Sequence, residues 1–475
     1  MISKDNKENI LYIKNKLGNS SDIVIRNINN ISYIFLDSVS SDDKISDFLN
    51  KSISNINSFN NLFNKLEKSI YSSNVSIEDD YSNILYKLTS GFTVIFINGY
   101  NKSITIETRT KLDRGIQEST SESIIRGPKD SFTENHIINL GLIRKRIKTS
   151  DLWIDNSMVG KRTKTIVSVL YINGIAKKKN INKIKKIINN INIDGILDSG
   201  YIKEFIQKSE TSFPEIISTE RPDLVSGSLL EGKIVILVEN SPFALILPAL
   251  LIDFLHSPED YYQDSINSSF TRIIRLLSFI LTVITPAFYI AVTTWNQEVI
   301  PNELLISLSL QKIGVPFPTT LELIIMITTF EILREADIRI PNASGASISI
   351  VGALILGEAA VQAGIVSPII IIVVAFTSIS AMVFTDVDFI NCIRYWRLIF
   401  IIFASLLGFI GIVVAFLLFL TKICSLEIFD IPYTTPTSPL IFKSLKDSFI
   451  RSERTKQKYR PPYLTRNIKK LGDKK

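Results

Sequence analysis

The residues best suited to chemistry in this sequence are Glu358 and Gln362, which stand in a long apolar stretch. Glu358 is the one ionisable side chain between Ile340 and Thr385, and Gln362 follows one turn later on the same face of a helix. A charge at such depth costs about 2.5 kcal/mol or more and usually faces water or a partner. This pattern favours contact with a cation over covalent chemistry.

Small residues surround Glu358 and would let helices approach closely. They are Gly352, Ala353, Gly357, Ala359, Ala360, Ala363 and Gly364, which suit a place where identical helices converge. A ring of Glu358 carboxylates would attract cations, and Val351, Leu354 and Ile365 would supply a dry gate on the same stripe. The competing interpretation is that Glu358 pairs within its own chain, with Arg394 or Arg397.

Two further glutamates, Glu322 and Glu331, are secondary candidates. They are nine residues apart, so a helix would place them on opposed faces. For both of them, packing or pairing between subunits is favoured over contact with an ion.

An enzyme is disfavoured by what the sequence lacks. It contains no phosphate-binding glycine loop, nucleophile elbow or metal-ligand cluster. Its two cysteines, Cys392 and Cys424, lie in or beside apolar segments, and it has only two histidines, His136 and His256. Disulfide, metal and cofactor chemistry are therefore not expected.

The apolar segments of the second half predict a helical membrane domain over residues 246–425. A helix needs about 20 apolar residues to cross a bilayer. Four spans are predicted at 276–295, 343–364, 367–385 and 398–421, the third begun by Ser367 as cap and Pro368 in the first turn. Segment 243–255 is too short to cross and is expected to lie in the interface or to enter partway. Segment 303–335 is interrupted by charge and is expected to form a pair of half-buried helices, with a full extra pass as the alternative. Buried helices of a large soluble protein are the less favoured alternative.

Basic residues set the expected orientation. Arg272 and Arg275 precede the first span, and a basic tail over 426–475 follows the last, which places both chain ends in the cytoplasm. Four passes satisfy this but leave Arg394 and Arg397 on the outer side, and six passes would move other charges.

The first half is expected to be an α/β soluble region of two tandem similar subdomains, 1–120 and 161–245. Each contains an aliphatic strand, a polar turn and a helix, and later a short helix that ends at Gly91 or Gly232 before a strand, a turn and a second strand. Chance similarity of two ordinary α/β units is the alternative. The lysines of "NINKIKKIINNINIDG" are explained by AT-rich codon bias and carry no functional weight.

A connector over residues 121–160 joins the two subdomains. Ser131 and Glu134 match a capping box and predict a helix start, followed by an apolar face of Ile137, Leu140, Ile143 and Ile147. Basic residues at the end of this helix are favoured by its dipole. Nucleic-acid binding is disfavoured because no aromatic side chain is interleaved among them.

Four blocks resemble the A subunits of the GerA family of spore germinant receptors. They are "ESIIRGPKDSFTENHIINLGLIRKRIKTSDL", "GKRTKTIVSVLYINGIA", "RPDLVSGSLLEGKIVILVENSPFALILPALLIDFLHSPEDYY" and "SIVGALILGEAAVQAGIVSP". The resemblance covers most of the chain from about Glu122, and stage V sporulation protein AF is a sibling branch with the same blocks.

The resemblance implies a receptor in the inner membrane of the spore. Its partners would be a B subunit similar to amino-acid permeases, a C lipoprotein and further copies of the A subunit around a path for monovalent cations. The RGP-containing connector would join subdomains or neighbouring subunits at an interface formed by Arg126, Gly127, Pro128, Arg144 and Arg146, and its charges would pair with acids across that interface. A secondary transporter and a non-conducting scaffold remain the rival functions.

Overall fold

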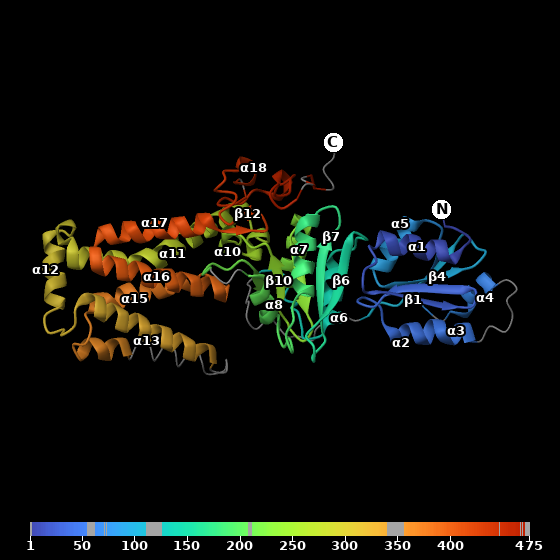
Figure 1. Ribbon diagram of the computed structural model, residues 1–475, viewed down its shortest axis with the longest axis horizontal. Coiled ribbons are helices and arrows are strands. Elements are labelled where there is room, and N and C mark those ends of the chain that lie inside the picture. The colour runs from blue at the N-terminus through green and yellow to red at the C-terminus, as the bar shows by residue number, and fades with distance from the viewer. Residues whose placement is uncertain are drawn as a thin grey trace. The chain divides into compact units, whose positions relative to one another are not determined.

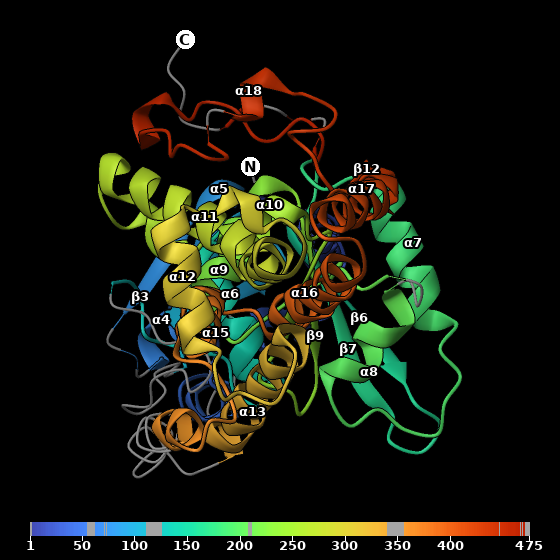
Figure 2. The ribbon, with the colours of Figure 1, turned by 90° about the vertical axis from the view of Figure 1, so that its left-hand side faces the viewer.

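The computed structural model describes residues 2–54, 62–70, 72, 74–110, 126–207, 211–339, 356–445, 447–465, 467, 469 and 470. The chain divides into two compact units. Unit 1 comprises Met1–Glu210, Glu215–Ala249 and Glu453–Lys475, and unit 2 comprises Thr211–Pro214 and Leu250–Ser452. Figures 1 and 2 show the elements of each unit from two directions.

The first sheet of unit 1 has five antiparallel strands in the order β1-β2-β4-β5-β3. The strands are β1 Ile23–Ile28, β2 Ile31–Leu36, β3 Val75–Glu78, β4 Phe92–Ile97 and β5 Ser103–Glu107. The accompanying helices are α1 Asn6–Lys16, α2 Asp42–Ile45, η1 Ser46–Asn50, α3 Lys51–Ser54, α4 Leu62–Ser69 and α5 Tyr81–Thr89.

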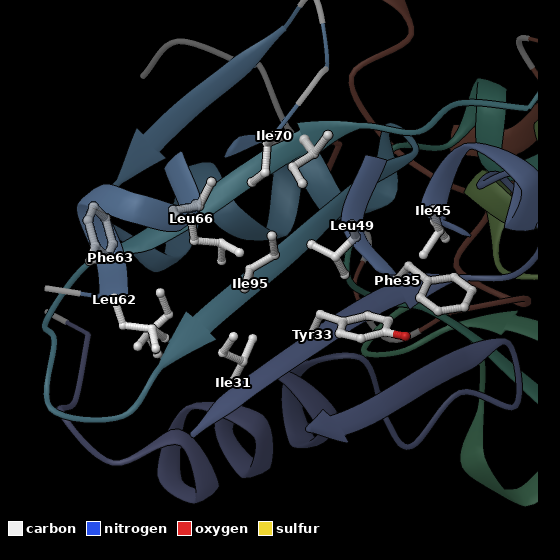
Figure 3. Close-up of a cluster of buried hydrophobic side chains, with 13 residues drawn as sticks. Ile31, Tyr33, Phe35, Ile45, Leu49, Leu62, Phe63, Leu66, Ile70 and Ile95 are labelled. Carbon is white, nitrogen blue, oxygen red and sulfur yellow. The ribbon is translucent and has the colours of Figure 1, made fainter. Parts of the chain in front are cut away.

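Both faces of this sheet are covered, which explains why β2 is buried along its whole length and has Ser32 as its one small polar residue. Alternate strand residues such as Tyr33 and Ile95 point to one face and pack with Leu49 and Leu66 from η1 and α4 (Figure 3). The residues in between, such as Ile34, Leu36 and Phe96, pack on the other face with α1 and α5. A strand buried on both faces needs an apolar residue at nearly every position.

The second sheet has five antiparallel strands in the order β6-β7-β9-β10-β8. The strands are β6 Leu152–Val159, β7 Thr165–Ile172, β8 Ile217–Thr219, β9 Ile234–Val238 and β10 Ala244–Leu247. The helices are α6 His136–Arg146, α7 Lys178–Asn189, α8 Ser199–Ile206 and α9 Pro222–Glu231. α9 packs on β7, β9 and β10 and against α6, whereas α7 packs on β6 and α8 on β10.

The two sheets share one strand order. Strands β6 to β10 take the same places in the second sheet as β1 to β5 take in the first. The order of elements along the chain also agrees: a helix, a hairpin, helices, a strand, a helix and a second hairpin. As predicted, a short helix precedes each glycine, α5 before Gly91 and α9 before Gly232.

The predicted connector differs from the structure in two respects. Its last residues are strand β6 of the second sheet. The predicted helix start at Ser131 is wrong, because α6 begins at His136 and Asn135 caps it by accepting the backbone N–H groups of Ile137 and Ile138. The backbone N–H of Phe132 donates to Glu220 O at 2.8 Å, so this stretch is held along the second sheet.

Arg144, in the last turn of α6, forms a buried ion pair with Asp22 of the first sheet. Its Nε donates to Oδ2 at 2.6 Å and its Nη2 to Oδ1 at 2.8 Å, and the Arg144 side chain has no exposed surface. Burial alone raises the pKa of Asp22, but the charge of Arg144 and hydrogen bonds from Arg144, Ser38 and Ser20 outweigh it and lower that pKa.

Hydrogen bonds to β6 extend this contact between the two sheets. Ser21 N donates to Ile154 O at 2.9 Å, and Ile154 N donates to Ser20 Oγ at 3.1 Å. The helix dipole that was expected to explain the basic residues therefore does not account for Arg144, which pairs across the junction of the two sheets.

Unit 2 consists mainly of helices. They are α10 Leu251–Leu255, η2 Pro258–Tyr261, α11 Ser265–Ile290, η3 Ala291–Trp295, η4 Gln297–Val299, α12 Asn302–Gln311, α13 Thr319–Arg339, α15 Pro368–Ala381, α16 Val387–Leu407, α17 Phe409–Ser425 and α18 Phe442–Leu445. A hairpin of β11 Glu427–Ile428 and β12 Ile431–Pro432 follows α17, and η5 Arg454–Lys456 belongs to unit 1.

Two helices among the described residues are long and apolar enough to cross a membrane, Ser265–Trp295 and Val387–Leu407. Pro368–Ala381 and Phe409–Ser425 are apolar but shorter. As expected, Ser367 occupies the N-cap position of α15 and Pro368 its first turn, but the Ser367 side chain makes no capping hydrogen bond. Predicted span 343–364 lies largely outside the described residues, which resume at Leu356 and are helical over 356–362.

Two predicted membrane segments need correction. The segment 243–255 does not form one membrane-entering helix, because Ala244–Leu247 is strand β10 of the second sheet. The predicted span 398–421 is divided, because α16 ends at Leu407 and α17 begins at Phe409.

Gly408 causes this division. Its φ of 59° and ψ of −135° belong to a conformation that favours glycine. A Cβ atom there would lie 2.7 Å from Trp295 Cβ and 2.9 Å from Asn296 Oδ1. The chain therefore reverses at Gly408, and α16 and α17 form a helical hairpin.

α11 and α16 run in the same direction. Phe389 at the start of α16 stacks on Phe254 of α10 and Phe279 of α11. At the far end, Trp295 Nε1 donates to Ser405 O at 3.0 Å. α16 therefore runs parallel to α11, whereas the four-pass arrangement makes the last span antiparallel to the first, and Arg394 and Arg397 lie in the middle part of α16.

Replacing Arg144 with Met should destabilise unit 1 by about 3–5 kcal/mol, because Asp22 would stay buried without its partner. Thermal unfolding would be followed by Trp153 fluorescence after Trp295→Phe and Trp396→Phe. The pair Asp22→Leu with Arg144→Met should regain much of the loss. Because the pKa of Asp22 is lowered in the folded chain, the ion pair stabilises the fold at pH values above the ordinary pKa of an aspartate. This stabilisation is lost as the pH falls through the lowered pKa of the folded state. Equal unfolding temperatures for Arg144→Met and the parent chain would contradict this assignment.

Gly408→Ala should destabilise unit 2 by about 1–3 kcal/mol through an unfavourable backbone conformation and contact with Trp295. Gly314→Ala is the matched control, since Gly314 also has positive φ, of 92°, but has nothing within 4 Å of an added Cβ. Thermal unfolding of the detergent-solubilised chain measures both, and a loss no larger for Gly408→Ala than for the control would exclude the steric explanation.

Candidate functional site

Glu358 and Gln362 lie on the helical residues 356–362, one turn apart. Gln362 Nε2 donates to Glu358 Oε1 at 3.1 Å, and both side chains are exposed in the single chain. Ile365 is also exposed, at 43%, whereas Val351 and Leu354 lie outside the described residues. The carboxylate of Glu358 thus has a glutamine neighbour and an open side.

Glu331 on α13 binds both arginines that were considered as partners for Glu358. Arg397 Nη2 lies 2.6 Å from Glu331 Oε1, and Arg394 Nη2 lies 2.8 Å from Glu331 Oε2. The Arg397 side chain is 4% exposed. The predicted alternative of a Glu358 pair with Arg394 or Arg397 is therefore wrong, because Glu331 holds both guanidinium groups.

Glu322 is 1% exposed and accepts a hydrogen bond from the backbone N–H of Ser367 at 2.9 Å. Ser367 is the cap of α15, so this carboxylate sits at the positive end of a helix dipole. Both carboxylates therefore have a partner within the chain, that of Glu322 in a buried position and that of Glu331 in a partly exposed one.

The five connector residues do not gather into one site. Arg126, Gly127 and Pro128 are exposed, and Arg144 pairs with Asp22 as described above. Arg146 Nη2 contacts Asp130 Oδ1 at 2.5 Å, within the connector itself.

A polar cluster at the start of α11 was missed by sequence reasoning. Asp260 accepts from Arg272 Nε at 3.1 Å and from Arg275 Nη1 at 2.7 Å. Arg272 also reaches Asp447, and His256 Nε2 lies 2.6 Å from Ser448 O. Burial and the charge of Arg272 lower the pKa of His256 to about 4, so the imidazole is neutral near pH 7. Asp447 and Ser448 are 175 and 192 residues from Arg272 and His256 in the chain, so no local spacing could reveal these contacts.

Comparison with known proteins gives one consistent family. The family model described as Bacillus/Clostridium GerA spore germination protein matches residues 11–463. Spore germination protein KA of Bacillus subtilis is 36% identical over 99% of this chain and 88% of its own length. The uncharacterized membrane protein YfkQ of the same organism is 36% identical over 86% of this chain and 80% of its own.

The matches among solved structures include one that covers part of the chain. It is the crystal structure of the N-terminal domain of the A subunit of the Bacillus megaterium spore germinant receptor GerK3, 36% identical, covering 53% of this chain and 97% of that one with a TM-score of 0.42. The family match spans nearly the whole sequence, and the chain therefore belongs to the GerA family of spore germination proteins.

Proposed function

We propose that this chain is the A subunit of a germinant receptor and forms part of a path for monovalent cations through the inner membrane of the spore. Membership of the GerA family supports the role in germination. The B subunit similar to permeases and the C lipoprotein are the partners that the resemblance implies. Both chain ends are proposed to be cytoplasmic.

Exposed apolar side chains of unit 2 support its place in a bilayer. Leu398, Ile402 and Leu406 form an exposed stripe on α16, and Ile410, Val413 and Leu417 are exposed on α17. Water would disfavour so much contiguous apolar surface, whereas lipid or a second subunit would cover it. Arg272 and Arg275 lie in the first half of α11, before its most apolar part, which suits the cytoplasmic side.

The exposed position of Glu358 is the observation that supports the proposed cation path. The described glutamates Glu322 and Glu331 each have a partner inside the chain, but the Glu358 side chain is exposed beside Gln362. In a bilayer such a carboxylate must face water or another protein, because lipid contact is costly. A ring of subunits with Glu358 turned to a central wet axis meets this requirement and attracts cations.

Unit 1 fits the same proposal as a soluble region built from two repeats. The shared strand order of its two sheets supports duplication of one α/β subdomain. The buried Arg144–Asp22 pair would keep the two repeats together as one body.

Glu358→Gln should lower cation conductance of the reconstituted chain, on the order of tenfold, because focusing of cations by the ring of charges is lost. Planar-bilayer recording with potassium and chloride gradients measures conductance and selectivity. Glu303→Gln, an exposed glutamate on α12, is the control and should retain the parent selectivity. Unchanged conductance and selectivity in Glu358→Gln would remove Glu358 from the path, and a parent chain without current would favour a scaffold.

The detergent-solubilised chain should be a closed homo-oligomer, since a central path needs several copies around one axis. Native mass spectrometry should give an integer multiple of the 53.5 kDa chain. A strictly monomeric chain across the concentrations used for conductance recording would exclude the central path.

A further inference from the structure

Helix α7 presents a lysine face to solvent. It and the preceding residue contain six lysines and no acid, while Ile181, Ile184 and Ile188 form its buried face. Lys178, Lys179, Lys183 and Lys186 are exposed. Lys185 of this helix pairs with Asp155 of β6, at 2.5 Å between Nζ and Oδ2.

The C-terminal tail is attached to the second sheet next to this helix. Lys177 Nζ donates to Tyr463 O at 2.5 Å, and Thr465 forms an isolated β-bridge with Ala176. Arg460 Nε donates to Leu230 O at 2.8 Å. Together these contacts hold residues 460–465 at the N-terminal end of α7.

The attached tail adds further positive charge and an aromatic group. Lys456, Lys458 and Lys469 are exposed, and Tyr459 is 52% exposed among them. From Glu453 to Lys470 the sequence has one acid, Glu453, against seven lysines and arginines. Glu453 pairs with Lys456 at 3.2 Å, so a large positive excess remains.

Two covalent connections tie this surface to the helices proposed to cross the membrane. The chain passes from β10 to α11 through residues 248–264, and from α17 to the tail through residues 426–452. A cluster of four to eight basic residues on the cytoplasmic side of a spanning helix is typical of binding to anionic lipid, worth about 1 kcal/mol per residue near the surface. Tyrosine is enriched at the same depth, among the headgroups.

We propose that the lysine face of α7 and the attached tail form one basic surface that binds the headgroups of anionic phospholipids. The inference rests on the proposed membrane location of unit 2. Nucleic acid has the same charge, but the connections to spanning helices favour lipid. Anchoring the second sheet to the membrane at this surface would limit its movement relative to the bilayer.

The test uses the full chain reconstituted in vesicles. Cys392→Ser and Cys424→Ser remove the native thiols, and a donor fluorophore is attached at Asn182→Cys, an exposed position between the lysines. Energy transfer to an acceptor-labelled lipid headgroup is compared in two kinds of vesicle. One contains phosphatidylcholine alone, and the other also contains about 30% phosphatidylglycerol, which gives the surface a strong negative potential. Transfer should increase several-fold with phosphatidylglycerol at 0.1 M salt and fall at about 0.5 M, where the Debye length is short.

The matched variants remove four charges each. The first variant replaces four lysines of α7 with Gln and should abolish the increase in energy transfer: Lys178, Lys179, Lys183 and Lys186. The control replaces four exposed lysines in and near α1 with Gln and should retain the increase: Lys4, Lys7, Lys14 and Lys16. Equal transfer in both lipids for the parent chain would overturn the proposal. RNA that shifts the donor's anisotropy through the same lysines, with no response to phosphatidylglycerol, would also overturn it.

Flotation of the chain with vesicles after an alkaline wash separates this inference from the proposed function. A chain that does not float contradicts the membrane location and with it both proposals. A chain that floats and conducts cations but shows no transfer that depends on phosphatidylglycerol contradicts the lipid surface alone.

Discussion

The structure of this chain depends on one constraint, the cost of leaving a charge unpaired in a low-dielectric environment. Glu331 meets it with Arg394 and Arg397, and Glu322 meets it with a backbone N–H at the start of α15. The contact described for the Glu358 carboxylate is a hydrogen bond from the neutral side chain of Gln362, not a pair with a cation. This difference between Glu358 and the other two glutamates is the basis of the proposal that several subunits surround a central path.

Unit 1 meets the same constraint in a different place. Arg144 and Asp22 are both buried where the two sheets of unit 1 meet. The pair supplies direction as well as attraction, because two parallel hydrogen bonds fix the angle between guanidinium and carboxylate. It explains how two sheets, each complete with its own helices, behave as one compact unit.

The C-terminal tail makes contacts within both units. Its earlier part reaches the polar cluster at the start of α11, through Asp447 and Ser448, and its later part is attached to the second sheet. Each contact lies within its own unit, and the covalent chain joins them at Ser452 and Glu453. A tail that composition alone describes as basic is thus a structural element of both units.

The sequence by itself determined the family, the α/β character of the first half, the apolar helices of the second half and the short helices before Gly91 and Gly232. These features follow from local composition and periodicity or from long matching blocks. Only the tertiary structure decided which charges meet: Glu331 with Arg394 and Arg397, Arg144 with Asp22, and Asp260 with Arg272. It also showed that an apolar run can reverse at Gly408 or become a buried strand at Ala244–Leu247. Hydrophobicity does not distinguish these outcomes, because lipid and a protein core both select apolar side chains, whereas a charge pair depends on distances that only the folded chain sets.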